Sequence, residues 1–229
     1  MMDDRQELLN LYDGLRVADV RDGLDTLMLH HVGTMAPEIR PLWRTRAYGL
    51  ARTGRYVPYD GPNLDIAPEK YWEWVGKYYQ EICPYPFADG IQPGDFVVLD
   101  LGGLIVGLIG SNNTLGMTKA GMRGMVTNGG IRDTDEVILQ KIPCWCVAPA
   151  QSMPQLRLKY ESHEKPVSIG GVLVNPGDMV VADGDGVIVV PRKTARDVAR
   201  WAREESERDR KGRRKLYEDL RLPIDETVK

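Results

Sequence analysis

Short apolar and β-branched runs alternate with helical patterns through residues 93–202. This alternation constrains the fold more than any other feature of the 229-residue chain. Runs of four to eight apolar residues without alternation are typical of strands buried on both faces. The expected strands are 49–57, 96–100, 104–109, 124–128, 144–148, 167–174, 179–182 and 187–190, with helices at 114–123 and 135–140. The pattern predicts an α/β domain with central sheets flanked by helices.

The two ends of the chain are expected to be helical. Apolar residues at helical spacing predict one or two helices over 3–29, broken near Gly14. A long helix is expected from about residue 193, and it becomes almost wholly charged over 203–215. The sequence contains neither an internal repeat nor a linker, so residues 1–229 are predicted to form a single domain.

An aromatic-rich segment interrupts this pattern at about residues 56–87. Six of the ten tyrosines lie in it. Aromatic and apolar residues at spacings of three and four predict a helix with one aromatic face, and Pro68 is well placed in its first turn. We interpret the segment as an insertion into the domain.

Charge and cysteine content narrow the possible partners and the cellular location. The formal net charge is -3, which gives no electrostatic reason to expect a nucleic-acid or anionic-membrane partner. No run approaches the roughly 20 apolar residues that span a bilayer, and the acidic start lacks the pattern of a secretory signal. Cys83, Cys144 and Cys146 are too few for a disulfide framework, so a reducing cytoplasm is expected.

A loop of small and polar residues opens the helix expected at 114–123. It consists of Gly110, Ser111, Asn112 and Asn113. The N-terminus of a helix offers unpaired backbone N–H groups and a positive potential, and both attract anions. We therefore expect these four residues to help bind the carboxylate of a small acid.

Arg132 and Asp133 stand side by side after a second glycine turn at 129–130. Arginine holds a carboxylate through two parallel hydrogen bonds, and an aspartate can hold a hard cation such as Mg²⁺ that keeps several waters. Together they predict a pocket for a 2-oxo acid, with its carboxylate on Arg132 and its keto oxygen on the metal. The alternative is a local ion pair or helix cap, which such a pair forms more often.

The residues around this pair match a longer pattern, G-x-x-G-x-V-x-x-G-x-x-R-D. It is filled by Gly121, Gly124, Val126, Gly129, Arg132 and Asp133. This pattern resembles the signature of the RraA-like family, which includes 4-hydroxy-4-methyl-2-oxoglutarate and 4-carboxy-4-hydroxy-2-oxoadipate aldolases and regulators of ribonuclease activity. The resemblance covers about four-fifths of the chain. It implies a swivelling β/β/α fold and a homotrimer or homohexamer with sites between subunits.

The resemblance also implies roles for individual residues. Arg132 would bind the substrate carboxylate, and Asp133 would anchor Mg²⁺ or Mn²⁺. Ser111 departs from the family pattern, because the family has an aspartate there and a hydroxyl cannot supply the missing negative charge. Asn112 or Asn113 could hold a water instead. Glu204 or Glu205 of a neighbouring subunit would approach the metal, and the alternative is that both belong to a solvated charged helix.

The implied function is that of a metal-dependent lyase, an aldolase or decarboxylase that acts on a 2-oxo acid through a pyruvate enolate. The Ser111 departure motivates a second interpretation, a metal-dependent dehydratase or isomerase of a sugar-derived acid. A third is a non-catalytic regulator that binds an RNA-degrading enzyme. The aromatic insertion is either a lid over a larger 2-oxo acid or a segment that packs on the domain or at a subunit interface.

Overall fold

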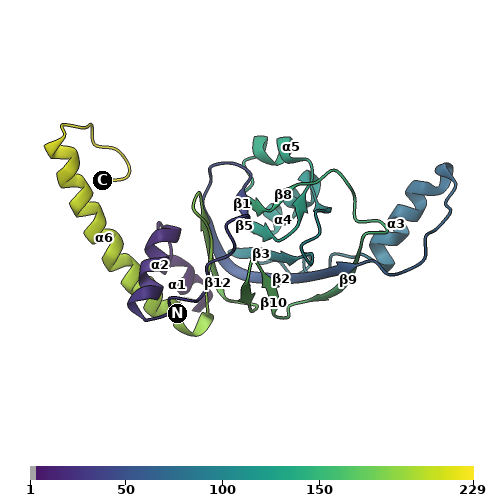
Figure 1. The fold of residues 1–229 in the computed structure, drawn as a ribbon, viewed down its shortest axis with the longest axis horizontal. Helices are drawn as coiled ribbons and strands as arrows, with labels where there is room; N and C mark the ends of the chain where they lie inside the picture. Colours follow the sequence, from purple (N-terminus) through teal and green to yellow (C-terminus); the bar gives the residue numbers. More distant parts are fainter. Residues whose placement is uncertain (1–3) are drawn as a thin grey trace.

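A computed structural model describes residues 4–229 and builds them around an eight-stranded mixed sheet (Figure 1). The strands of this sheet are β1 Arg40–Pro41, β2 Ala47–Pro58, β3 Asp95–Asp100, β5 Gly124–Thr127, β7 Cys144–Cys146, β9 Leu158–His163, β12 Met179–Asp183 and β13 Gly186–Val190. Their order is β1-β7-β5-β3-β2-β12-β13, and β9 pairs with β2. The strands β2, β3, β5 and β7 are parallel neighbours. Parallel strands are covered on both faces, which explains the unbroken apolar runs of β3, β5 and β7.

A second, three-stranded parallel sheet was not expected from the sequence. It contains β4 Gly107–Ile109, β6 Gly130–Ile131 and β8 Ala148–Pro149. The predicted single strand over 144–148 is therefore wrong, because β7 lies in the main sheet and β8 in the second sheet. Gly129 lies where the chain crosses between the two sheets. A Cβ at this position would stand 2.6 Å from the carbonyl oxygen of Leu104, so only glycine fits without a shift.

The chain also forms two β-hairpins. One joins β10 Val167–Ile169 to β11 Val172–Val174, where the sequence predicted one continuous run. Gly170 and Gly171 turn the chain there with positive φ angles of 56° and 77°. The other hairpin joins β12 to β13 and confirms the predicted turn at 183–186.

Six α-helices surround the sheets within residues 4–229. Their bounds are α1 Asp4–Leu11, α2 Val17–Thr26, α3 Tyr71–Glu81, α4 Ser111–Ala120, α5 Thr134–Leu139 and α6 Ala195–Asp219. Figure 1 shows α4 and α5 over the central strands, α3 at one end and α6 at the other. None of these helices is long and apolar enough to cross a membrane.

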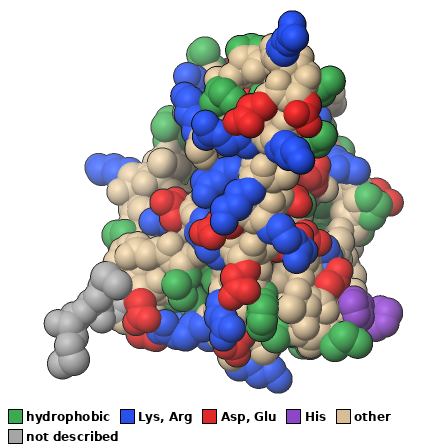
Figure 2. All heavy atoms as spheres, turned by 90° about the vertical axis from the view of Figure 1, so that its left-hand side faces the viewer, with side chains coloured by type: hydrophobic (Ala, Val, Ile, Leu, Met, Phe, Trp, Pro, Cys, Tyr) green, Lys and Arg blue, Asp and Glu red, His purple; other side chains and the backbone are tan. Residues whose placement is uncertain are grey.

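The N-terminal segment forms two helices, as the apolar spacing predicted. They are separated near Gly14, which has a φ of 77°. The first predicted residue, Asp3, lies outside the described residues. Helix α2 packs closely on α6, because a Cβ at Gly23 would stand 2.6 Å from the carbonyl oxygen of Val198. The exposed face of this end carries interspersed acidic and basic side chains, which Figure 2 shows without a large patch of either sign.

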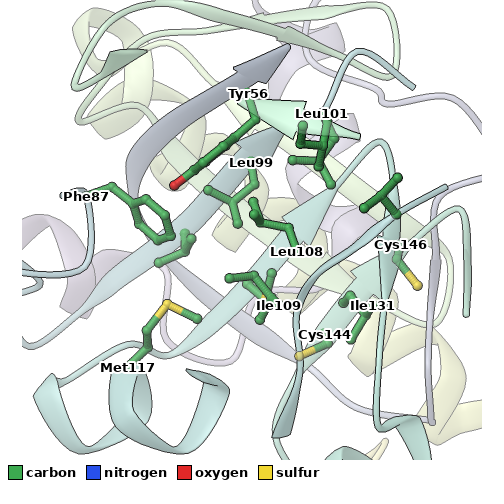
Figure 3. Packing of buried hydrophobic residues seen from close by; sticks show 14 of the residues in the cluster. Tyr56, Phe87, Leu99, Leu101, Leu108, Ile109, Met117, Ile131, Cys144 and Cys146 are labelled. Carbon is green, nitrogen blue, oxygen red and sulfur yellow. The ribbon is translucent and has the colours of Figure 1, made fainter. Parts of the chain in front are cut away.

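The largest apolar cluster lies between the main sheet, α4 and the aromatic segment (Figure 3). Tyr56, Tyr78 and Phe87 are each at most 1% exposed within it. Much of the aromatic segment therefore packs on the domain.

The three cysteines are buried and unpaired, as expected for strand and core cysteines. Burial raises the pKa of Cys146 to about 11, so its thiol stays protonated at neutral pH.

Candidate functional site

The residues with candidate chemistry meet at the carboxyl-end edge of the three-stranded sheet. Gly110 and Ser111 follow β4, and Arg132 and Asp133 follow β6. The backbone N–H of Arg132 donates to the carbonyl oxygen of Ile109 at 2.9 Å, which fixes the two segments side by side. The parallel strands β4 and β6 end at the same edge of the sheet. Ser111 and Asp133, which are 22 positions apart in sequence, therefore become neighbours in space.

Asp133 lies at the N-terminus of α4. Its Oδ2 accepts the backbone N–H of Ser111 at 3.2 Å and the Ser111 hydroxyl at 3.5 Å. The backbone of Asp133 is left-handed, with a φ of 52°, a conformation that non-glycine residues seldom adopt. The positive end of α4 thus faces the carboxylate of Asp133. The Ser111 amide, which the sequence assigned to a substrate carboxylate, already has a protein partner.

Helix α4 begins three residues earlier than predicted. Gly110 is extended, and its N–H donates to the side-chain Oδ1 of Asn113 at 3.4 Å. The helix ends at Gly121, whose φ of 116° is left-handed. The earlier start places Ser111, Asn112 and Asn113 in the first helical turn, where the backbone N–H groups of Asn112 and Asn113 have no partner among residues 4–229.

Arg132 keeps its guanidinium available. The side chain is 31% exposed, and its Nε lies 3.8 Å from Oδ1 of Asp133, at the outer limit of an ion pair. Within residues 4–229 the guanidinium makes no hydrogen bond. Gly107 makes room for its aliphatic stem, since a Cβ there would stand 1.9 Å from Cγ of Arg132. A long, half-exposed ion pair contributes little, so the guanidinium can bind an incoming carboxylate.

The donor set at Asp133 fits a cation that needs few protein ligands. The side chain is 40% exposed, and one oxygen, Oδ1, has no hydrogen-bond partner among the described residues. No group of three or more His, Cys, Asp or Glu side chains gathers anywhere in residues 4–229. This excludes a site closed by one protomer's described side chains. A Mg²⁺ or Mn²⁺ site that keeps several waters on a single carboxylate is compatible with it.

Glu204 and Glu205 do not reach this site within one protomer. Both lie on α6, which extends away from α4 and α5 in Figure 1. Glu204 pairs with Arg200, and Glu205 pairs with Arg208, on the same helix. Their predicted approach to the metal requires a neighbouring subunit and stays a prediction.

A pocket of about 290 Å³ lies beside the first two turns of α4. Residues of α4 line one wall, and the return of the aromatic segment lines the other. The lining includes Tyr85, Phe87, Ile109, Asn112, Gly116 and Met117. The sequence pattern indicated Asn112 and Asn113, which both line the pocket, but not the other residues, although the aromatic cluster was a signal that this segment is unusual.

Comparisons with known proteins agree with this architecture. A provisionally named 4-hydroxy-4-methyl-2-oxoglutarate aldolase of Halalkalibacterium halodurans is 30% identical over 130 residues, 56% of this chain and 61% of that protein. A protein of the same name from Cupriavidus taiwanensis is 38% identical over 104 residues, 45% of this chain and 62% of that protein. The chain thus spans about three-fifths of the length of both relatives.

Solved structures match over nearly the whole chain. Streptomyces coelicolor RraAS2, described as an unusual member of the RNase ES inhibitor RraA protein family, aligns with a TM-score of 0.73 at 25% identity. The alignment covers 93% of this chain and 98% of that one. The expected RraA-like α/β fold is confirmed. The RraA-like family model, described as aldolase/RraA, matches residues 17–189, and the chain therefore belongs to the RraA-like family.

Proposed function

We propose that the protein is a divalent-metal-dependent lyase that cleaves a 2-oxo acid next to its keto group. One observation carries the proposal. The carboxylate of Asp133 is held by the N-terminus of α4, and its Oδ1 accepts no hydrogen bond within residues 4–229. The guanidinium of Arg132 lies beside it in a long ion pair, with Nε 3.8 Å from Oδ1. A cation and an anion site in contact match the two functional groups of a 2-oxo acid. The aldolase names of the sequence relatives support the same chemistry.

The residues of the site would have the following roles in the reaction. Arg132 binds the C1 carboxylate through its two-pronged guanidinium. Asp133 would hold Mg²⁺ or Mn²⁺ through Oδ1, and such an ion would supply Lewis-acid chemistry to the keto group. The free N–H groups of Asn112 and Asn113 add positive potential where negative charge develops. Ser111 orients Asp133 and does not replace the missing acid.

In an aldol cleavage the C3–C4 bond breaks and its electron pair forms the pyruvate enolate. The C4 hydroxyl loses its proton, and C4 leaves as a carbonyl compound. The enolate then takes up a proton at C3 and gives pyruvate. Because Ser111 cannot act as the base at neutral pH, we propose that a water held by Asn112 or Asn113 accepts the hydroxyl proton.

The test is release of pyruvate from oxaloacetate and from a 4-hydroxy-2-oxo acid. Activity is expected with Mg²⁺ or Mn²⁺, to be lost with EDTA and restored by the metal. Arg132→Ala should lower kcat/KM about 10²- to 10³-fold, as for removal of one stabilising donor. Arg44→Ala is the matched control, because Arg44 is exposed on the loop after β1. A near wild-type rate for Arg132→Ala would contradict the assignment.

A second candidate is the regulatory function suggested by the likeness to Streptomyces coelicolor RraAS2. Ser111 in the position of the family aspartate favours it, and so does the exposed, charged second half of α6. A regulator would release pyruvate from neither substrate and would slow an RNase E-type enzyme in a cleavage assay. Metal-dependent turnover of a sugar acid without pyruvate would instead indicate a dehydratase or isomerase.

A further inference from the structure

The pocket beside α4 has one wall from the aromatic segment and one from α4. Tyr85 and Phe87 belong to the aromatic segment, whereas Gly116 and Met117 belong to α4. Figure 3 shows Phe87 and Met117 next to each other at this place. The pocket therefore depends on a segment that we interpret as an insertion.

Hydrogen bonds and ring contacts fix the aromatic wall. The Tyr85 hydroxyl donates to the carbonyl oxygen of Leu108 at 3.0 Å, which ties the segment to β4. The Tyr56 hydroxyl donates to the carbonyl oxygen of Pro84 at 2.6 Å. Tyr85 and Phe87 pack edge to face, with ring centroids 6.2 Å apart. A wall with these contacts is preformed and needs little ordering when a ligand binds.

The chemistry of the lining selects a neutral, apolar group. Most of its side chains are aromatic or aliphatic, the amides of Asn112 and Asn113 are neutral, and the exposed Asp89 is the one charged group among the described lining residues. A carboxylate entering the pocket would meet this negative charge and no cation. A cavity of roughly 150 Å³ can hold benzene, so the volume of about 290 Å³ is ample for a phenyl or branched alkyl group.

The pocket and the proposed reaction site share one stretch of backbone. Ile109 lines the pocket, and its carbonyl oxygen accepts the N–H of Arg132. Ser111 contacts Asp133, and the next residue, Asn112, lines the pocket. Consecutive residues of α4 therefore contact the reaction site and the pocket. A short substrate held on Arg132 can therefore extend its far end into the pocket.

We propose that this pocket binds the C4 substituent of the substrate and selects 4-hydroxy-2-oxo acids whose substituent is neutral and apolar. The proposal rests on the lyase function above and names its substrate class. In the cleavage the C3–C4 bond breaks, the hydroxyl proton goes to water, and C3 gains a proton. The products are pyruvate and an aldehyde that still carries the apolar group in the pocket.

Gly116 provides the test. A Cβ at this position meets no atom within 4 Å, so a larger side chain enters the pocket without a backbone clash. Glycine inside a helix is also unfavourable, so Gly116→Leu should not unfold the protein. Gly76→Leu is the matched control, because Gly76 lies inside α3, has the same open space and is not in the pocket lining.

The measurement compares kcat/KM for 4-hydroxy-2-oxo-4-phenylbutanoate, 4-hydroxy-2-oxopentanoate and 4-hydroxy-2-oxoglutarate. The wild type should prefer the phenyl over the methyl and carboxylate substrates by about 10- to 100-fold, the range for filling an apolar pocket. Gly116→Leu should abolish this preference, and Gly76→Leu should retain it. Equal rates on all three substrates, or an unchanged preference in Gly116→Leu, would overturn the proposal.

Two further readouts separate this proposal from the lyase function. Pyruvate release from oxaloacetate reports the lyase chemistry without an apolar substituent. Calorimetric binding of 2-oxo-4-phenylbutanoate and 2-oxobutanoate reports the pocket without turnover, and 2-oxo-4-phenylbutanoate should bind more tightly in the wild type and Gly76→Leu only. Absence of turnover with this binding pattern overturns the lyase alone. Turnover of oxaloacetate with equal binding of both acids overturns the pocket assignment alone.

Discussion

The position of the Asp133 carboxylate depends on the absence of a side chain at Gly110. Gly110 lies under it, and a Cβ there would stand 2.3 Å from Oδ2 of Asp133. This contact is much closer than a carbon and a carboxylate oxygen can approach, so Gly110→Ala must displace the carboxylate from the N–H of Ser111. We expect metal-dependent pyruvate release to fall by at least about 10²-fold, with weaker binding of Mn²⁺, because misplacement by an ångström is costly in catalysis.

The control for this prediction is Gly212→Ala. Gly212 lies on α6 with no atom within 4 Å of an added Cβ, so activity should persist and the thermal midpoint should rise slightly. Mn²⁺ affinity measured by electron paramagnetic resonance would check the prediction directly. Unchanged affinity in a folded Gly110→Ala protein would separate the metal from Asp133.

The residue pattern predicted more of the site than of its environment. Arg132, Asp133 and Ser111 do lie together, as the family resemblance implied. The contact of Ser111 with Asp133 could not be read from the sequence, because it depends on α4 starting at Ser111 and on the left-handed backbone of Asp133. Neither feature follows from local propensity, since both arise from packing between β4 and β6.

At the scale of elements, the strands of the second sheet show where sequence patterns lose information. The strands β6 and β8 have two residues each, too few for any periodicity. In the sequence β8 looks like the continuation of β7, although Val147 already donates its N–H to the carbonyl oxygen of Gly129 between the two sheets. Longer patterns such as β3, α3 and the first half of α6 were predicted well because they bury one face or all of their residues.

The contact between Asp19 and Arg16 at the start of α2 depends on pH. Asp19, 1% exposed in α2, accepts hydrogen bonds from the backbone N–H of Arg16 at 2.8 Å and from its guanidinium. Burial pushes the pKa of Asp19 upward, but the hydrogen bonds and charge of Arg16 outweigh it and hold the pKa below the ordinary 3.8. A lowered pKa in the folded state stabilises the protein above the unfolded value and loses that effect as pH falls.

Asp19→Asn should therefore lower the free energy of unfolding by about 2 kcal/mol at pH 7, the range for hydrogen bonds to a buried charged group. The difference in unfolding free energy between Asp19→Asn and wild type should shrink as the pH falls below about 4. At that pH the Asp19 carboxyl of the unfolded wild-type chain begins to take up its proton. Urea denaturation at several pH values measures both. Asp65→Asn, at an exposed loop position, should match wild type throughout, and a pH-independent difference for Asp19→Asn would contradict the titration.

For the whole molecule, the candidate metal site has one carboxylate from the described residues of a protomer, and assembly must supply any second acid. The predicted homotrimer or homohexamer makes this testable by complementation. Asp133→Asn and the double variant Glu204→Gln/Glu205→Gln should each be inactive alone. When equal amounts of the two are refolded together, about one quarter of the wild-type activity should return. The reason is that a site takes Asp133 from one subunit and the glutamate from another, and each is intact in about half of the subunits.

A mixture of Asp133→Asn with Arg132→Ala should stay inactive, because both substitutions remove a residue that the same subunit contributes to a site. Full activity of the double glutamate variant alone would show that α6 supplies no ligand, and the site would then operate with Asp133 and water.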